Sequence, residues 1–262
     1  MSKEKYQITE KATWLTLVII KHDLEDYFYK LNDSSSDIFG SINELRLVRD
    51  SFITLKNLAD CIGRVMPILR SSSSVELREN TKRIHKRVDF IDHVRNRSAG
   101  HFDTKVTERA VQWIPEIFHE KNFAPIDVYL CHKALLESSI NSFLGPSGSQ
   151  KLFDHEIDIL YPPDREVFFK FLIELIGDSI EWVKEAISHL DNLIAKYDSA
   201  LVPEMSAVAG QTNFNLAEES TFDYCPEKLL QVLEGAKAEF IKQGRPELVG
   251  VLDQLARKVI LE

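Results

Sequence analysis

Apolar residues recur at alternating intervals of three and four positions along residues 41–70, and this spacing is the strongest constraint on the fold of the chain. The series comprises Leu45, Val48, Phe52, Leu55, Ala59, Ile62, Met66 and Leu69. In an α-helix such residues share one face, so we expect a long helix that packs nearly antiparallel to a neighbour. Pro67 is expected to bend or end this helix, because its ring meets the carbonyl of the residue four positions earlier.

The same periodicity extends over most of the chain. It predicts further helices at about 10–31, 75–99, 107–119, 126–144, 165–197, 226–243 and 246–261. The chain has only 10 glycines and 9 prolines in 262 residues, which favours long helices over a turn-rich sandwich. We therefore expect an all-α protein, an up-and-down helical bundle of four to five long helices with a C-terminal helical pair.

One segment interrupts the periodicity and suggests how the chain is divided. Residues 198–222 lack a helical pattern and are rich in Ser, Ala, Thr and Asn. We therefore predict a helical bundle over residues 1–197, a linker or excursion over 198–225, and a C-terminal helical hairpin over 226–262.

Several features favour a soluble cytoplasmic protein without a membrane segment. The longest apolar runs, such as LVII at 17–20, are too short to cross a bilayer, and the charged N-terminus has no apolar run of a signal peptide behind it. The three cysteines, Cys61, Cys131 and Cys225, are widely spaced and form no CxxC pair. Such cysteines are typical of reduced thiols in a cytoplasm.

The charge distribution points to one bounded basic region. The chain has a net charge of −9, which argues against a surface that binds nucleic acid everywhere, but the window from Lys82 to His101 carries +4. We predict that this strip contacts RNA phosphates through Lys82, Arg83, Lys86, Arg87 and Arg97. The alternative interpretation is an ordinary solvated helix face.

Within this region the stretch HVRNRSAGHFD at 93–103 carries the candidate chemistry. The apolar stripe of the helix at 75–99 should include position 95, and that residue is Arg95. A guanidinium at a helix seam needs water, a phosphate or a carboxylate, because an unpaired buried charge is costly. Gly100 should stop the helix, so His101 is expected near Arg95, with Asn96 orienting a neighbour. Alternatively, Arg95 and Asn96 cap the last carbonyls of the helix.

Arg95-Asn96, followed by His101 six positions after the arginine, resembles the signature of the HEPN superfamily. The helical pattern of about residues 10–197 is similar to its four- or five-helix bundle. The resemblance implies a metal-independent ribonuclease of the kind found in toxin–antitoxin, abortive-infection and RNA-processing systems, with an active cleft usually completed by dimerisation. The chain is long for a minimal member, and the C-terminal pair has no counterpart in the basic bundle.

The resemblance also implies roles for these residues. Cleavage of RNA through the ribose 2′-hydroxyl needs proton transfer near neutral pH, for which histidine is suited, and stabilisation of phosphoryl charge, for which arginine is suited. We therefore assign His101 to general acid/base catalysis, Arg95 to phosphate stabilisation and Asn96 to support. This chemistry requires no metal and no cofactor. The resemblance implies RNA as substrate, a second copy in a homodimer, and an antitoxin or another protein as a possible partner.

Two other functions are compatible with parts of the same sequence. A catalytically inactive helical bundle that binds RNA, nucleotide or a protein partner would use the same residues without chemistry. Asp92, His93, His101 and Asp103 resemble a metal-dependent phosphohydrolase cluster in composition only. The adjacent pair has the order Asp-His rather than His-Asp and lacks an evident distant partner, which argues against that class.

Overall fold

The computed structural model describes residues 7–33, 37–69, 74–118, 124–194 and 226–242, with short stretches at 209–210, 212, 214–215, 244, 249–250, 252–253 and 256–257. The chain divides into two compact units, Thr9–Ile194 and a second that comprises Met1–Ile8 with Ala195–Glu262. Among the described residues the regular elements are helices, apart from an isolated bridge between Leu144 and Gln150. The predicted all-α class is confirmed.

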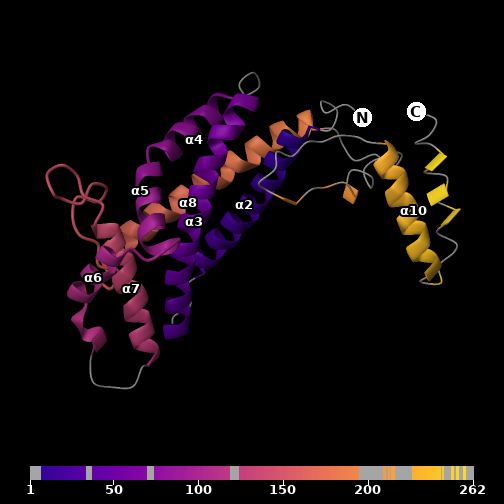
Figure 1. Ribbon diagram of the computed structural model, residues 1–262. Coiled ribbons are helices and arrows are strands. Elements are labelled where there is room, and N and C mark those ends of the chain that lie inside the picture. The colour runs from indigo at the N-terminus through magenta and orange to yellow at the C-terminus, as the bar shows by residue number, and fades with distance from the viewer. Residues whose placement is uncertain are drawn as a thin grey trace. The chain divides into compact units, whose positions relative to one another are not determined.

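The first unit is a helical bundle (Figure 1). Its α-helices are α2 (Ile8–Asn32), α3 (Ile38–Leu69), α4 (Val75–His85), α5 (Val88–Val94), α6 (Thr104–Trp113), α7 (Pro125–Asn141) and α8 (Pro162–Leu193). A π-helical turn, η1 (Arg95–Ala99), follows α5, and a short 3₁₀ helix, η2 (Pro115–Phe118), follows α6. The long helices predicted from periodicity are therefore present, and α3 continues through Pro67 for only two further residues.

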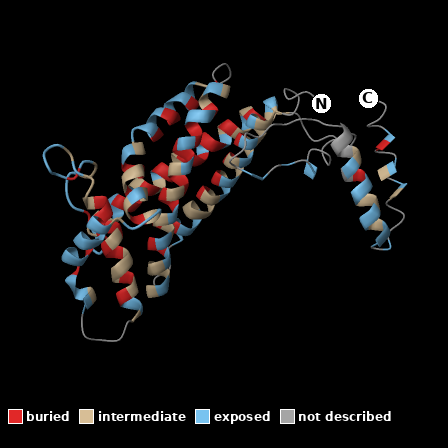
Figure 2. Ribbon diagram, in the orientation of Figure 1, coloured by how far each residue is buried: buried red, intermediate tan, exposed pale blue. Residues whose placement is uncertain are grey.

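The helix α3 lies at the centre of this unit, where it contacts α4, α5, η1, α7 and α8. Its predicted apolar face is buried at every position except Met66, which is partly buried against the core. Figure 2 shows buried positions recurring along α3 and α8, as two packed amphipathic helices require. The largest fully buried side chain, Trp182 of α8, donates from Nε1 to Thr81 Oγ1 of α4 at 2.8 Å.

The predicted single helix at 75–99 is interrupted, and this is a correction to the sequence-based prediction. Ser74 caps α4 by accepting a hydrogen bond from the Leu77 amide at 2.9 Å, but the helix ends at His85 and a turn at 86–87 separates it from α5. The interruption falls where the packing changes, because α4 lies mainly against α8 and less against α3, whereas α5 and η1 lie against α3 and α7.

A buried ionic cluster ties α6, α7 and the loop before α8 together. Lys133 and Glu137 of α7 form an ion pair of 2.9 Å, and Lys133 also lies 3.0 Å from Asp158. Glu137 is 0% exposed and accepts from Trp113 Nε1 at 2.6 Å and from the Ile159 amide at 2.5 Å. Burial nevertheless raises the pKa of the Glu137 carboxyl, since desolvation outweighs these contacts.

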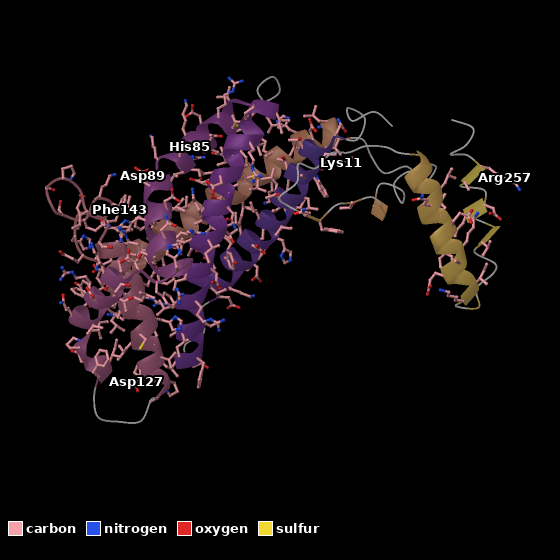
Figure 3. All side chains as sticks on the ribbon, in the orientation of Figure 1. Lys11, His85, Asp89, Asp127, Phe143 and Arg257 are labelled. Atoms are coloured by element: carbon pink, nitrogen blue, oxygen red, sulfur yellow. The ribbon has the colours of Figure 1, made fainter. Side chains whose placement is uncertain are left out.

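Local hydrogen bonding caps the start of α7. Asp127, labelled in Figure 3, accepts a hydrogen bond at Oδ2 from the Ala124 amide at 2.7 Å, in the manner of a capping box. The proline at the first helical position, Pro125, has no amide hydrogen to leave unpaired there.

In the second unit the structure describes α10 (Pro226–Lys242) and short helical stretches that follow it. Lys237 of α10 forms ion pairs with Glu234 at 2.5 Å and with Asp253 at 2.7 Å. The predicted linker at 198–225 and the helix at 246–261 lie outside the described residues, except for the short stretches named above. Within the described part of the chain, none of the helices combines the length and apolar character that crossing a bilayer requires.

Candidate functional site

The stretch 93–103 spans the end of α5, the π-helical turn η1 and the loop before α6. The Gly100 amide donates to the Arg95 carbonyl at 2.7 Å, five residues back, which closes the wide turn. A side chain at position 100 would meet the Arg95 guanidinium, because a Cβ placed there lies 3.0 Å from both Cζ and Nε. Glycine therefore lets the Arg95 side chain lie directly on the backbone of the residue before His101.

Arg95 lies at the margin of the helix seam rather than inside it. The buried positions of this segment are Phe90, Ile91, Val94 and Ser98, whereas Arg95 is half-buried. The apolar face of this helix is wide enough to include either position 94 or position 95. The structure buries Val94 and leaves Arg95 partly exposed. The Arg95 guanidinium donates from NH1 to the Asn96 side-chain oxygen at 2.7 Å, so these two predicted site residues do contact each other.

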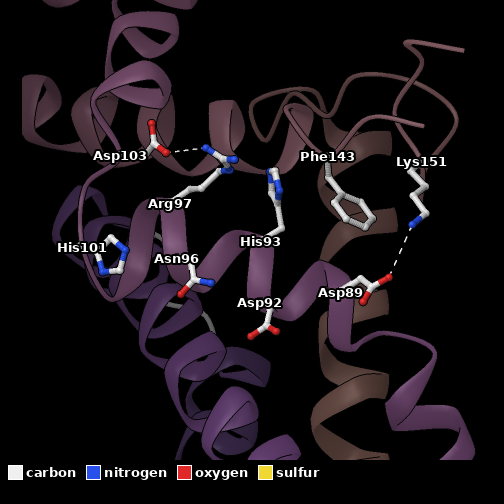
Figure 4. Close-up of a pocket in the computed structure, with 9 residues that line it drawn as sticks. All are labelled: Asp89, Asp92, His93, Asn96, Arg97, His101, Asp103, Phe143 and Lys151. Atoms are coloured by element: carbon white, nitrogen blue, oxygen red, sulfur yellow. Dashed lines mark hydrogen bonds and ion pairs between the residues drawn. The ribbon is translucent and has the colours of Figure 1, made fainter. Parts of the chain in front are cut away.

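An open cleft of about 700 Å³ lies beside η1. Its lining, drawn in Figure 4, comprises Asp89, Asp92, His93, Asn96, Arg97, His101, Asp103, Phe143 and Lys151. Two of the three predicted catalytic residues, Asn96 and His101, are thus on the cleft wall, and both side chains are exposed. Arg95 is not part of this lining, although its contacts with Asn96 and Gly100 hold it beside the cleft.

The charges of the cleft are largely arranged in pairs. Arg97 lies 2.5 Å from Asp103, and Lys151 lies 3.8 Å from Asp89 (Figure 4). Asp92 lies 3.0 Å from Lys56 of α3. A polyanion entering the cleft would therefore exchange partners with these carboxylates instead of meeting unopposed positive charge.

His93 is a further cleft residue that the sequence-based prediction did not assign to the site. Its Nε2 lies 2.9 Å from Ser142 Oγ, and its ring packs edge-on against Phe143 with centroids 5.2 Å apart. Burial, and then the positive charge of Arg97, lower the pKa of the His93 imidazole. The sequence did contain an indication of this role. Asn96 and Arg97 follow His93 by three and four positions, so the three residues are expected on one helix face.

Arg97 lines two clefts. Besides the cleft of Figure 4, it lines a second one of about 470 Å³ together with Lys105, Arg109 and Ser142, among others. Ser142 is also the partner of His93, so the two clefts meet at one hydrogen-bonded corner of the molecule. This part of the predicted basic region is therefore next to the candidate site.

The other predicted RNA-binding residues lie along α4 and the turn after it, and the cleft lining does not include them. Lys82 pairs with Glu79 at 2.7 Å, and Arg83 and Arg87 lie 3.7 and 3.9 Å from Asp178 of α8. Lys86 is exposed. The part of the basic strip on α4 and the turn at 86–87 therefore lies outside the cleft lining, whereas Arg97 is part of it.

The residues that resemble a phosphohydrolase cluster do not form a metal centre. Within the described part of the chain, no group of three or more His, Cys, Asp or Glu side chains is arranged to hold a metal ion. Of the four, Asp92 and Asp103 are engaged with Lys56 and Arg97.

Fold and site together define an all-α helical bundle with a polar, histidine-containing cleft at the end of one helix. Comparisons of the chain with family models, with curated proteins and with solved structures found no match.

Proposed function

We propose that this chain is a HEPN-like, metal-independent endoribonuclease that cleaves RNA through attack of the ribose 2′-hydroxyl, in a cleft beside η1. The observation that carries the proposal is the placing of Asn96 and His101 on the wall of one open cleft, with Arg95 held between Asn96 and Gly100. The cleft lining also includes a second imidazole, that of His93, and the guanidinium of Arg97.

The proposed reaction needs three functions from these side chains. A base removes the proton of the 2′-hydroxyl, the resulting oxygen attacks the adjacent phosphorus, and the 5′-oxygen leaves with a proton from an acid. The products are a 2′,3′-cyclic phosphate and a 5′-hydroxyl. His101 acts in proton transfer, Arg95 stabilises the charge on the phosphoryl oxygens, and Asn96 orients Arg95 through their 2.7 Å hydrogen bond.

The same proposal includes partners and a setting. A homodimer would bring two such clefts together and supply both proton-transfer roles, and the strip on α4 would lead RNA towards them. The resemblance favours a cytoplasmic role in bacterial defence or in a toxin–antitoxin system, with an antitoxin or another protein as partner.

A second function, an inactive bundle that binds RNA, nucleotide or a protein partner, is favoured by a different observation. Arg97 and Lys151 are each paired with a carboxylate of the cleft, so binding an anion here requires breaking existing ion pairs. An inactive module would tolerate paired charges in the cleft. A ribonuclease would have to break these ion pairs each time it binds a substrate phosphate.

The test is cleavage of single-stranded RNA in the presence of a chelator by the wild type and by His101→Ala and Arg95→Ala. We expect cleavage by the wild type and a loss of about a hundredfold or more in each variant, because each removes a proton-transfer or charge-stabilising group. Matched controls are His22→Ala and Arg64→Ala, which change exposed residues of α2 and α3. Unchanged cleavage in both site variants, or dependence of cleavage on a divalent metal, would contradict the mechanism. RNA binding without cleavage would favour the inactive module.

A further inference from the structure

A groove separate from the proposed active cleft lies between α3, α6, η2 and α7. It has a volume of about 350 Å³, within the lower range of small-molecule sites. Its walls are mostly apolar and include Phe102, Val111, Phe118 and Leu135. None of these residues lines the cleft that contains His101, so a ligand of the groove would be distinct from the RNA proposed above.

Large apolar side chains at this groove are unusually exposed. Phe102 is 64% exposed, Phe118 is 68% exposed and Val111 is 43% exposed. Single exposed apolar residues are ordinary, but these three line one groove, so a single ligand could cover all of them. An apolar ligand would remove this surface from water.

The polar end of the groove is a half-buried guanidinium. Arg49 of α3 donates from Nε to the Ser98 carbonyl at 2.7 Å, and its NH1 lies 3.3 Å from His132 Nδ1. The Arg49 guanidinium also lies over the Phe102 ring, 5.1 Å from its centroid. These contacts hold the charge in place with neutral partners.

Among the described residues no carboxylate lies within ion-pair distance of Arg49; burial lowers the pKa of its guanidinium, and the negative charge of the neighbouring Asp50 opposes this shift. His132 cannot supply a counter-ion, because an imidazole is neutral or positive. Burial and the nearby guanidinium of Arg49 lower the pKa of His132, which keeps its ring neutral and able to accept the hydrogen bond. Because burial outweighs the charge of Asp50, the Arg49 guanidinium would gain from an anion in direct contact with it, at one end of an apolar surface.

We propose that this groove binds a small apolar monocarboxylate, with the carboxylate on Arg49 and the aliphatic or aromatic body against Phe102, Val111 and Leu135. A carboxylate carries one charge and needs only one cation, and the guanidinium has five N–H donors, of which Ser98 and His132 engage only part. The apolar walls disfavour the ribose and phosphates of a nucleotide, which would lose hydrogen bonds to water there.

The test is calorimetric titration of the full chain with octanoate and with 1-octanol, which has the same alkyl chain without the charge. We expect octanoate to bind and octanol to bind at least about tenfold more weakly, as the loss of one charge-assisted contact implies. Arg49→Gln should weaken octanoate binding by a similar factor and leave octanol binding nearly unchanged. Arg64→Gln, an exposed arginine four turns further along α3, is the matched control and should retain octanoate binding.

Two further measurements keep the proposal testable if Arg49→Gln does not fold. Val111→Trp fills the groove from its wall while leaving Arg49 in place, and it should abolish octanoate binding. Cys131 lines the groove, so bound octanoate should slow its alkylation by iodoacetamide, as followed by peptide mass spectrometry.

The proposal is overturned by absence of octanoate binding, by equal binding of octanol, or by unchanged binding to Val111→Trp. Displacement of octanoate by adenosine monophosphate of higher affinity would overturn it in favour of a nucleotide site. RNA cleavage has no part in these readouts, so the result is independent of the proposed ribonuclease.

Discussion

The Arg95 guanidinium lies on Gly100, and this contact is the most sensitive single feature of the proposed active site. A methyl group at position 100 would lie 3.0 Å from Cζ and Nε of Arg95, so the guanidinium would have to move. The backbone of Gly100, with φ −74° and ψ −33°, suits any residue. The two consequences of Gly100→Ala are therefore separable.

We expect Gly100→Ala to change the free energy of unfolding by no more than about 1 kcal/mol, because a flexible side chain absorbs the new methyl group. RNA cleavage should fall by about tenfold or more, because the phosphate-stabilising group is displaced. Urea unfolding and cleavage assays on the same preparation measure both effects. Gly63→Ala, at an open position of α3, is the control, and wild-type cleavage by Gly100→Ala would contradict the assigned role of Arg95.

Two half-buried histidines make the stability of the bundle depend on pH. Burial, together with Arg97 near His93 and with Arg49 and Arg46 near His132, lowers the pKa of both imidazoles, while Asp103 and the Ser139 backbone oppose the shift at His93. As the pH falls below about 6.5, the unfolded chain binds protons that the folded chain resists. Stability is therefore expected to fall from pH 7.5 to pH 5.5.

The melting temperature of wild type and of the double variant His93→Gln/His132→Gln, followed over this pH range, checks the expectation. The wild type should lose more stability than the variant, since the variant lacks both groups. The buried Glu137 is common to both proteins, so its contribution cancels in the comparison. His22→Gln, an exposed position, should follow the wild type, and equal slopes for all three proteins would show that the two imidazoles are not the cause.

Among the helices, α7 depends most on a buried charge pair. Lys133 and Glu137 lie 2.9 Å apart at 4% and 0% side-chain exposure. Removing one member leaves the other charged and poorly solvated, so we expect Lys133→Met to lower the free energy of unfolding by about 3 to 5 kcal/mol. The double variant Lys133→Met/Glu137→Gln removes both charges and should recover part of this loss.

Urea unfolding of the two single variants and the double variant gives the coupling energy. The matched control is the exposed pair of Lys184 and Glu181 on α8, 3.0 Å apart, for which the same substitutions should cost less than about 1 kcal/mol. If both pairs gave equally small effects, the cluster around Glu137 would not stabilise the contact between α6 and α7.

The sequence predicted the helices well because their apolar spacing reports directly on the buried face. It predicted the interruption at 86–87 poorly, because the helical pattern continues on both sides of the turn and the two helices differ mainly in packing, α4 against α8 and α5 against α3. The π-helical turn likewise leaves no periodic signal within five residues. Periodicity alone also does not decide whether Val94 or Arg95 is buried, because this depends on where the neighbouring helix lies.

The charged cluster of α7 was missed for a related reason. A Lys–Glu pair spaced by four residues usually lies on a solvated helix face, so this spacing alone was no reason to expect Lys133 and Glu137 to be buried. The available signal was that both follow Tyr129 at helical spacing on a face that is otherwise apolar. In the site, Asn96 and His101 were predicted from the motif, whereas His93 becomes significant only through its contacts with Ser142 and Phe143.

For the molecule as a whole, the core and both candidate sites lie within the unit Thr9–Ile194. The buried cluster that contains Phe52, Trp182 and their neighbours draws all its members from this unit. The cleft beside η1 and the groove at Arg49 are likewise lined only by its residues. The first unit should therefore fold, and carry out the proposed RNA cleavage, without the second unit.

We expect a fragment of residues 1–194 to fold cooperatively in urea with a far-UV circular dichroism signal typical of a helical bundle, and to retain the RNA cleavage proposed for the full chain. A fragment of residues 1–160 is the matched control. It lacks α8, whose Trp182, Phe168 and Leu172 are fully buried, so its core cannot close and no cooperative transition is expected. A non-cooperative or aggregated 1–194 fragment would mean that the second unit is needed for folding. Cooperative folding with loss of cleavage would instead assign the second unit to binding RNA or to bringing two clefts together.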